Sequence, residues 1–286
     1  ISGLAVNPAT GAASTTSADG VLRTWPAALA TDRAFPAHAA GVTALSLSAD
    51  GNLAATASDD KSVRVTNAAN GQQMQHLANL PAAAKSVALS PKADAIYAGT
   101  ADGKLFAWSA DGKPKFDGPA HEGAVVGVAV HGTSLFTAGA DGVLRSWAPP
   151  AKPKEKEPAL AKLAANPAPV KGGFAALTIN PASGQPVTVG ADKIVRSWDP
   201  ATLTEAKAYP ALPAAGTAVA VSKDGSAIAA AAGKVVKLWQ TADAKELPFP
   251  ALPADVLALA FSADRTKLAV GFADNTAGIY EVATGQ

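Results

Sequence analysis

The sequence lacks several residues on which common functions depend. It contains no cysteine, one methionine and 6% aromatic residues, so disulfide bonds, thiolate metal sites and a cysteine nucleophile are excluded. The lack of cysteine does not fix the compartment, because such a chain suits oxidising and reducing surroundings equally. No apolar run approaches the roughly 18 residues of a membrane span, and no signal-peptide pattern follows Ile1.

Basic and acidic residues are nearly equal in number. The 24 basic and 23 acidic residues give a formal net charge of +1, so the chain has no bulk field that would attract nucleic acid or an anionic membrane. We therefore expect no nucleic-acid partner and no membrane insertion. Apolar residues make up 48% of the 286 positions, and they permit a core built mainly from small side chains.

The sequence repeats itself at long intervals. The stretches "TAGADGVLRSW" (137–147) and "TVGADKIVRSW" (188–198) are nearly alike, and their final position, the aromatic slot, recurs with gaps of 41, 42, 39, 51, 41 and 41 residues. The slot is filled by Trp25, Thr66, Trp108, Trp147, Trp198, Trp239 and Tyr280. We infer seven repeats, at approximately 1–40, 41–84, 85–123, 124–172, 173–216, 217–254 and 255–286.

Each repeat reads as four short strands. In "VLRSW", Val143, Arg145 and Trp147 share one face and the residues between them the other, which is the period of a β-strand. Asp-Gly turns such as "SADG" at 17–20 and 48–51 supply the backbone angles of tight hairpins. Seven units of this kind predict an all-β fold, a seven-bladed β-propeller of four-stranded antiparallel blades.

The fourth repeat carries extra residues. They read "APPAKPKEKEPALAK" (148–162), and their prolines and alternating charges are unsuited to a sheet or a core. We expect residues 149–158 to form an exposed insertion. The repeat phase resumes after them, so we expect a single domain over 1–286.

The seventh repeat is shorter than the others. It supplies three strand-like stretches, "VLALAFS", "KLAVGFAD" and "TAGIYEV", and then ends at "ATGQ". We therefore expect the last blade to lack one strand within the given chain. A bare third strand would expose unpaired backbone groups. We expect residues outside this chain, or a partner strand, to complete the edge near 278–282, and the chain to be a segment of a longer polypeptide or complex.

The repeat unit is similar to the WD repeat, and the resemblance covers the whole chain in degenerate form. Trp198-Asp199 is the one literal Trp-Asp pair. The resemblance implies structural roles for an aspartate six residues before the aromatic slot, for a histidine before the first strand and for the tryptophans themselves. These residues are Asp19, Asp60, Asp102, Asp141, Asp192, Asp274, His38, His121, Trp25, Trp108, Trp147, Trp198 and Trp239.

The family's hydrogen-bonded set joins histidine, serine or threonine, aspartate and tryptophan. We expect no repeat to hold the full set. His38, Ser58 and Asp60 come closest, but Thr66 fills the tryptophan slot of that repeat. In the sixth repeat Gly233 takes the place of the aspartate.

No pattern in the sequence predicts catalysis or a bound group. The four histidines lack the spacing of metal ligands. The Asp-Gly turns return to a strand too soon for a calcium loop, and neither a phosphate-binding loop nor a G-x-S-x-G elbow occurs. We expect no catalytic, cofactor-binding or metal-binding residue, and no cofactor.

A basic residue lies two positions before the aromatic slot in five repeats. One residue per blade cannot converge on a single ligand, so we expect each stem to cover its aromatic neighbour and each charge to meet a carboxylate or water. The five residues are Arg23, Arg64, Arg145, Arg196 and Lys237.

The WD resemblance implies that partners bind the face carrying the turns between second and third strands. The residue before each turn aspartate is then a contact candidate: Ala18, Asp59, Ala101, Ala140, Ala191, Ala232 and Ala273. The sequence thus predicts a non-enzymatic protein–protein interaction or scaffold module, with a protein partner or an adjacent domain. The alternative is a propeller enzyme, lactonase-like or quinoprotein-like, whose channel site the sequence does not reveal.

Overall fold

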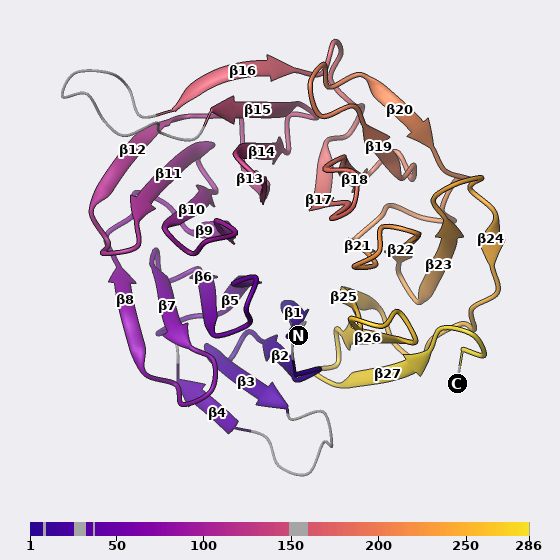
Figure 1. Cartoon of the computed structure of the whole chain (residues 1–286), viewed down its shortest axis with the longest axis horizontal. Helices are drawn as coiled ribbons and strands as arrows, with labels where there is room; N and C mark the ends of the chain where they lie inside the picture. Colours follow the sequence, from indigo (N-terminus) through magenta and orange to yellow (C-terminus); the bar gives the residue numbers. More distant parts are fainter. Residues whose placement is uncertain (8–9, 26–32, 37, 149–159, 286) are drawn as a thin grey trace.

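The computed structural model describes residues 1–7, 10–25, 33–36, 38–148 and 160–285. Over these ranges 27 strands form seven antiparallel sheets. Figure 1 shows the sheets as blades around a common axis, with the first strand of each blade innermost and the last at the rim. Among the described residues, no helix could cross a membrane.

The blades follow the chain in order. Blade 1 consists of β1 (Gly3–Val6), β2 (Ala13–Thr16), β3 (Val21–Trp25) and β4 (Arg33–Pro36). Blade 2 consists of β5 (Val42–Leu47), β6 (Leu53–Ser58), β7 (Val63–Asn67) and β8 (Gln73–Leu77). Blade 3 consists of β9 (Ala84–Leu89), β10 (Ala95–Thr100), β11 (Lys104–Ser109) and β12 (Pro114–Pro119). Blade 4 consists of β13 (Val125–His131), β14 (Ser134–Gly139), β15 (Leu144–Ala148) and β16 (Ala161–Ala165).

The second half continues the pattern. Blade 5 consists of β17 (Phe174–Ile179), β18 (Pro186–Gly190), β19 (Arg196–Trp198) and β20 (Glu205–Ala208). Blade 6 consists of β21 (Ala218–Val221), β22 (Ala227–Ala232), β23 (Val235–Gln240) and β24 (Glu246–Leu247). Blade 7 consists of β25 (Val256–Phe261), β26 (Lys267–Phe272) and β27 (Ala277–Glu281). The prediction of a seven-bladed all-β propeller with a three-stranded last blade is confirmed.

The aromatic slot falls in the third strand of every blade, as predicted. Trp25 lies in β3, Trp108 in β11, Trp147 in β15, Trp198 in β19, Trp239 in β23 and Tyr280 in β27. The expected insertion at 149–158 lies outside the described residues.

Glycine is required where a turn meets the connection to the next blade. Gly103 has a φ of +85°, and a Cβ at this position would lie 2.1 Å from the carbonyl oxygen of His121. The amide of His121 in turn donates to the carbonyl of Gly103 at 2.9 Å. The absence of a side chain thus lets the hairpin of blade 3 bond directly to the segment that begins blade 4.

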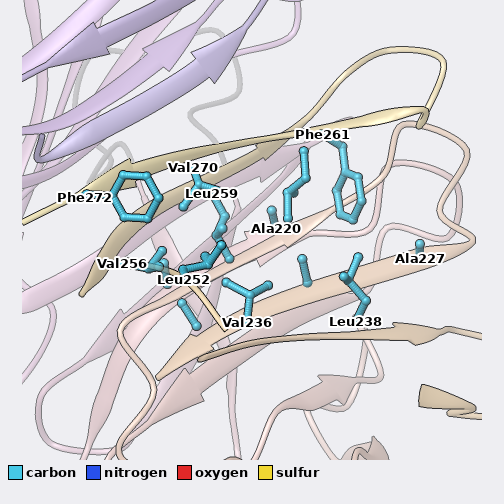
Figure 2. Packing of buried hydrophobic residues seen from close by; sticks show 14 residues of the cluster. Ala220, Ala227, Val236, Leu238, Leu252, Val256, Leu259, Phe261, Val270 and Phe272 are labelled. Carbon is cyan, nitrogen blue, oxygen red and sulfur yellow. The ribbon is translucent and has the colours of Figure 1, made fainter. Parts of the chain in front are cut away.

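The core lies between blades, so both faces of each sheet are buried. Figure 2 shows the interface of blades 6 and 7, where Val236 and Leu238 of β23 meet Val256, Val270 and Phe272. All six residues of β22, "AIAAAA", are buried, and its five alanines let the neighbouring blades approach closely. The alanine-rich composition therefore suits thin layers packed side by side.

The ring closes where blade 7 meets blade 1. Strand β1 packs against β25 and β26, and Figure 1 places β1 and β25 next to the centre of the disc. The main-chain nitrogen of Ile1 donates to the carbonyl oxygen of Phe272 at 3.1 Å. Side-chain packing and this bond join the first blade to the last.

Candidate interaction face

One face of the disc carries the hairpins between the second and third strands. We call it the turn face, and define it by these hairpins and the connections that lead from each blade to the next. The two kinds of segment bond to each other, as in the bonds from His38 to Gly20, from Val170 to Gly142 and from Leu252 to Lys234. In blades 1 to 6, main-chain hydrogen bonds therefore join each hairpin of the turn face to the connection that leads to the next blade.

The turn aspartates stabilise the hairpins that contain them. Five of them accept a hydrogen bond, at 2.9–3.2 Å, from the backbone N–H of the residue two positions further on: Asp19, Asp60, Asp141, Asp192 and Asp274. In blade 3, Asp102 accepts from the hydroxyl of Thr100 instead. In blade 6, Gly233 adopts a φ of +59° without an aspartate.

These bonds hold the carboxylates in their charged form. A hydrogen bond from Arg23, with further bonds from Ser17 and the Val21 amide, lowers the pKa of Asp19 to about 2. Burial opposes ionisation of Asp60, but bonds from Ser62, Ala39 and His38 outweigh it and lower its pKa to about 2. In the described part of the chain, no group of three potential metal-ligating side chains gathers.

Blade 4 contains the hydrogen-bonded set that the sequence analysis did not expect. His121 Nδ1 lies 3.0 Å from Asp141 Oδ1, and His121 Nε2 lies 2.7 Å from the hydroxyl of Thr137. The indole of Trp147 donates to the same hydroxyl at 2.9 Å. The expectation that no repeat holds the full set was wrong, because the hydroxyl comes from Thr137, four residues before the aspartate.

Blade 2 holds three members of the same set, with a different hydroxyl from the one expected. His38 Nε2 lies 2.8 Å from Thr56, and His38 Nδ1 lies 3.0 Å from Asp60. Ser58 instead donates to the carbonyl of Gly41 at 2.9 Å. Thr66 occupies the aromatic slot, so this blade has no indole to complete the set.

The other tryptophans keep only parts of the arrangement. Trp25 donates to Thr15 at 2.9 Å, and Trp198 donates to Thr188 at 2.8 Å. Trp108 stacks on Phe106, with ring centroids 5.7 Å apart.

Trp239 differs from Trp147 in the residue that faces its indole. Its Nε1 is buried without a hydrogen-bond partner. Ala230 pairs with Lys237, whereas in blade 4 Thr137 pairs with Arg145. Ala230 therefore stands where blade 4 has the hydroxyl that accepts from Trp147.

The basic residues before the aromatic slot bind neighbouring side chains, as the sequence analysis predicted for their charges. Arg23, Arg145 and Arg196 pair with their turn aspartates, and Lys237 pairs with Glu246 at 2.9 Å. Arg64 is the exception, since it donates to the amide oxygen of Gln73 at 2.9 Å. These cations are spread around the blades and do not converge on one anion site.

The axial cavity opens at the turn face. Its volume is about 870 Å³, and its wall is made mainly of alanine, valine, leucine and threonine from the innermost strands. Of the described residues that line it, Asp59 and Lys85 carry charge, and they pair at 2.7 Å. Leu257 on the same lining is 42% exposed.

The residues that precede the turn aspartates form a ring of mostly short side chains. Ala18, Asp59, Ala140, Ala191 and Ala273 are exposed, Ala101 is partly exposed and Ala232 is buried. Lys85 and Leu257 were not singled out from the sequence, because they lie in first strands and not in the turns. Their shared place, second in β9 and β25, was the available signal.

The fold and its turns define a class, the seven-bladed β-propeller built from WD-like units. A family model described as "WD domain, G-beta repeat" matches residues 30–67, which cover the end of blade 1 and most of blade 2. The match spans about one of the seven repeats, and together with the seven-bladed arrangement it supports a WD-repeat β-propeller. Such propellers commonly serve as scaffolds for protein interactions.

Among solved structures, the chain is similar to a computationally designed protein called Ika8. The two share 22% sequence identity with a TM-score of 0.76, and the alignment covers 100% of this chain and 85% of the designed chain. This likeness concerns the fold alone. No curated protein matches the sequence.

Proposed function

We propose that this chain is a non-enzymatic interaction module that binds a protein partner, or an adjacent domain, at the centre of the turn face. The observation that carries the proposal is the cavity mouth, where Leu257 and the Asp59–Lys85 pair stand out from a ring of alanines. An exposed leucine and an ion pair on the lining of the same cavity offer both apolar and charged contacts to one ligand.

The short side chains of the ring around the cavity mouth, formed by the residues before the turn aspartates, determine the kind of partner that fits. Five of the seven ring positions present an exposed short side chain or Asp59, so they offer shape complementarity and no deep pocket. Binding energy in such an interface concentrates in a few buried residues. We therefore assign the largest contributions to Leu257 and Lys85, with the alanines excluding water around them.

Site-specific photocrosslinking tests this proposal. A photoreactive residue in place of Ala140 or Ala191 probes the turn face, and one in place of Ser183, an exposed residue of the β17–β18 turn, probes the opposite face. In extracts of the source cell we expect one protein to crosslink from the two turn-face positions and not from position 183.

The captured protein, once identified and purified, allows a quantitative test. Leu257→Asp and Lys85→Glu should each weaken its binding about tenfold or more, as expected for central interface residues. Ser183→Asp is the control and should leave binding unchanged. Equal crosslinking from both faces, or unchanged binding in both mouth variants, would contradict the proposal.

A further inference from the structure

A second cavity lies between blades 3 and 4, on the face opposite the turn face. Its volume is about 450 Å³, a size common among small-molecule sites in proteins. Its lining comes from the β9–β10 and β13–β14 turns and from strands β10, β11, β12 and β13. Strands β10 and β13 pack against each other where the two blades meet (Figure 1). We call this cavity the interblade pocket.

Tyr97 gives the interblade pocket a hydroxyl group without a partner. The residue lines the pocket and is 2% exposed, and among the described residues no group hydrogen-bonds to its hydroxyl. A nearly buried hydroxyl costs free energy unless a ligand or water satisfies it. Burial and the charge of Asp94 raise the pKa of Tyr97, so the phenol stays protonated at neutral pH and can donate a hydrogen bond.

The repeat does not require a tyrosine at this place. Tyr97 pairs with the residue before the aromatic slot, and no other blade has a tyrosine at the same register. The counterparts are Ser14, Ala55, Phe136, Val187, Ala229 and Ala269. The hydroxyl is therefore a property of blade 3 and not of the fold.

The β9–β10 turn places a cation where related turns have an anion. In blades 2, 6 and 7, the serine that begins the turn donates to the aspartate two positions later, at 2.5–2.6 Å: Ser48 to Asp50, Ser222 to Asp224 and Ser262 to Asp264. In blade 3 Lys92 takes the position of that aspartate. Ser90 donates to Asp94 instead, at 2.6 Å.

Lys115 supplies a second cation to the pocket lining. It is the extra residue at an irregularity between β11 and β12. Lys115 is partly exposed, whereas its counterparts in three other blades are exposed: Met74, Leu163 and Ala206. Among the described residues, neither Lys92 nor Lys115 pairs with a carboxylate. With Asp94 as the one acidic group of the lining, one positive charge stays unbalanced.

We propose that the interblade pocket binds a small carboxylic acid with an aromatic body. The carboxylate accepts a hydrogen bond from Tyr97 and is attracted by Lys92 and Lys115, while the body lies against the apolar lining that includes Val130. The charges select an anion over a neutral molecule of the same shape, and the apolar lining selects an aromatic acid over acetate. The pocket is separate from the turn face.

Cinnamate serves as the probe, because it joins one carboxylate to an aromatic body. We expect it to bind the whole chain saturably in isothermal titration calorimetry, with a dissociation constant below about 1 mM. Cinnamamide has nearly the same shape without the charge, and acetate has the charge without the body. Each should bind about tenfold more weakly or less, because each lacks one of the two kinds of contact.

The hydroxyl of Tyr97 is tested by a variant that removes it alone. Tyr97→Phe should weaken cinnamate binding about tenfold, since a hydrogen bond to a charged group is lost. Tyr209→Phe is the matched control, because Tyr209 is a buried tyrosine in the cluster between blades 5 and 6. It should leave cinnamate binding unchanged. Circular dichroism and thermal unfolding establish that both variants fold.

Two charge variants should change the affinity in opposite directions. Lys115→Gln should weaken cinnamate binding about threefold and leave cinnamamide unaffected, because it removes an attractive charge near the surface. Asp94→Asn should strengthen cinnamate binding by a similar factor, since it removes a repulsive charge and keeps an oxygen that can accept from Ser90. Lys223→Gln, at an exposed lysine of the β21–β22 turn, is the control and should change neither affinity.

Four outcomes would overturn the proposal. They are the absence of saturable cinnamate binding, equal affinity for cinnamate and cinnamamide, equal weakening by Tyr97→Phe and Tyr209→Phe, and weaker binding after Asp94→Asn. Cinnamate binding that none of the pocket variants changes would place the ligand elsewhere in the molecule and would count against the proposal as well.

Discussion

The indole of Trp147 donates a hydrogen bond to the hydroxyl oxygen of Thr137 at 2.9 Å, deep between two blades. The same oxygen lies 2.7 Å from Nε2 of His121. The hydroxyl can donate to Nε2 while it accepts from the indole, and Nδ1–H then donates to Asp141. In this arrangement the histidine is neutral, in keeping with the lowering of its pKa by burial, and the bonds tie the turn face to the third strand of blade 4.

Removing the central hydroxyl tests this network. Thr137→Val keeps the shape of the side chain but leaves the indole N–H and His121 Nε2 without a partner. We expect the free energy of unfolding to fall by about 1–3 kcal/mol, measured by urea denaturation. Thr188→Val is the comparison, because Thr188 bonds Trp198 in a blade without the histidine. Its cost should be smaller, and an equal cost would show that His121 adds nothing.

Blade 6 permits the reverse experiment. Ala230→Thr introduces a hydroxyl at the register where blade 4 has Thr137, and it should accept from the buried Nε1 of Trp239. Satisfying this donor should raise the free energy of unfolding by about 1 kcal/mol. Ala230→Val has nearly the same shape without the hydroxyl and serves as the control. If the two variants unfold at the same urea concentration, the indole gains no bond from the threonine.

Asn180 joins blade 5 to blade 6. Its Nδ2 donates to the carbonyl of Gly225 at 3.0 Å in a buried contact, while its Oδ1 accepts from the amide of Ala182. Asn180→Ala leaves these groups unpaired, so we expect a loss of about 1–3 kcal/mol in unfolding free energy. Asn70→Ala, in an exposed turn where Asn70 accepts from the Gln72 amide, should cost less than half as much. A reversed order would contradict an interblade role.

Acidification should lower the stability of the folded protein in two separate pH ranges. Burial lowers the pKa of His121 below its ordinary value of 6.5, against the opposing charge of Asp141. The folded state therefore binds this proton less readily than the unfolded chain, so the histidine's contribution is complete above pH 6.5 and is lost as the pH falls below it. Asp19 and Asp60, with pKa values of about 2, lose their contributions as the pH falls from 3.8 toward 2.

Urea midpoints between pH 8 and pH 5 measure the upper range. Burial lowers the pKa of His38 as well as that of His121. We expect the midpoint to decrease on acidification, and His121→Gln to reduce that decrease, because one of the two buried histidines is gone. A His121→Gln curve parallel to the native one would show that His121 does not couple to folding in this range.

The sequence repeat made most of the architecture predictable. The hydrogen-bonded set of blade 4 was missed because the repeats differ in the residues that form it. Seven aromatic slots and the short apolar stretches located the blades and the three-stranded last blade. The set in blade 4 was missed because a search two positions before the aspartate finds Ser58 in blade 2 and Gly139 in blade 4, whereas the bonding hydroxyls are Thr56 and Thr137. Period-two alternation could not identify a core face, since blades bury both faces.

Lys85 and Leu257 escaped prediction for a different reason. The sequence places them in first strands, where the apolar pattern suggests core. Each, however, lies at the second position of a strand that borders the axial cavity. Exposure there depends on the width of the closed ring, and a linear sequence does not encode that width locally.

The closure between blades 7 and 1 bears on how the chain acquires its structure. Each blade is a continuous stretch of chain, so its contacts form between near neighbours, whereas the bond from Ile1 to Phe272 joins residues 271 positions apart. Because contacts distant in sequence form more slowly, we expect folding to proceed through an open arc of docked blades. Ring closure is then the last and slowest event, and on unfolding the same seam separates first.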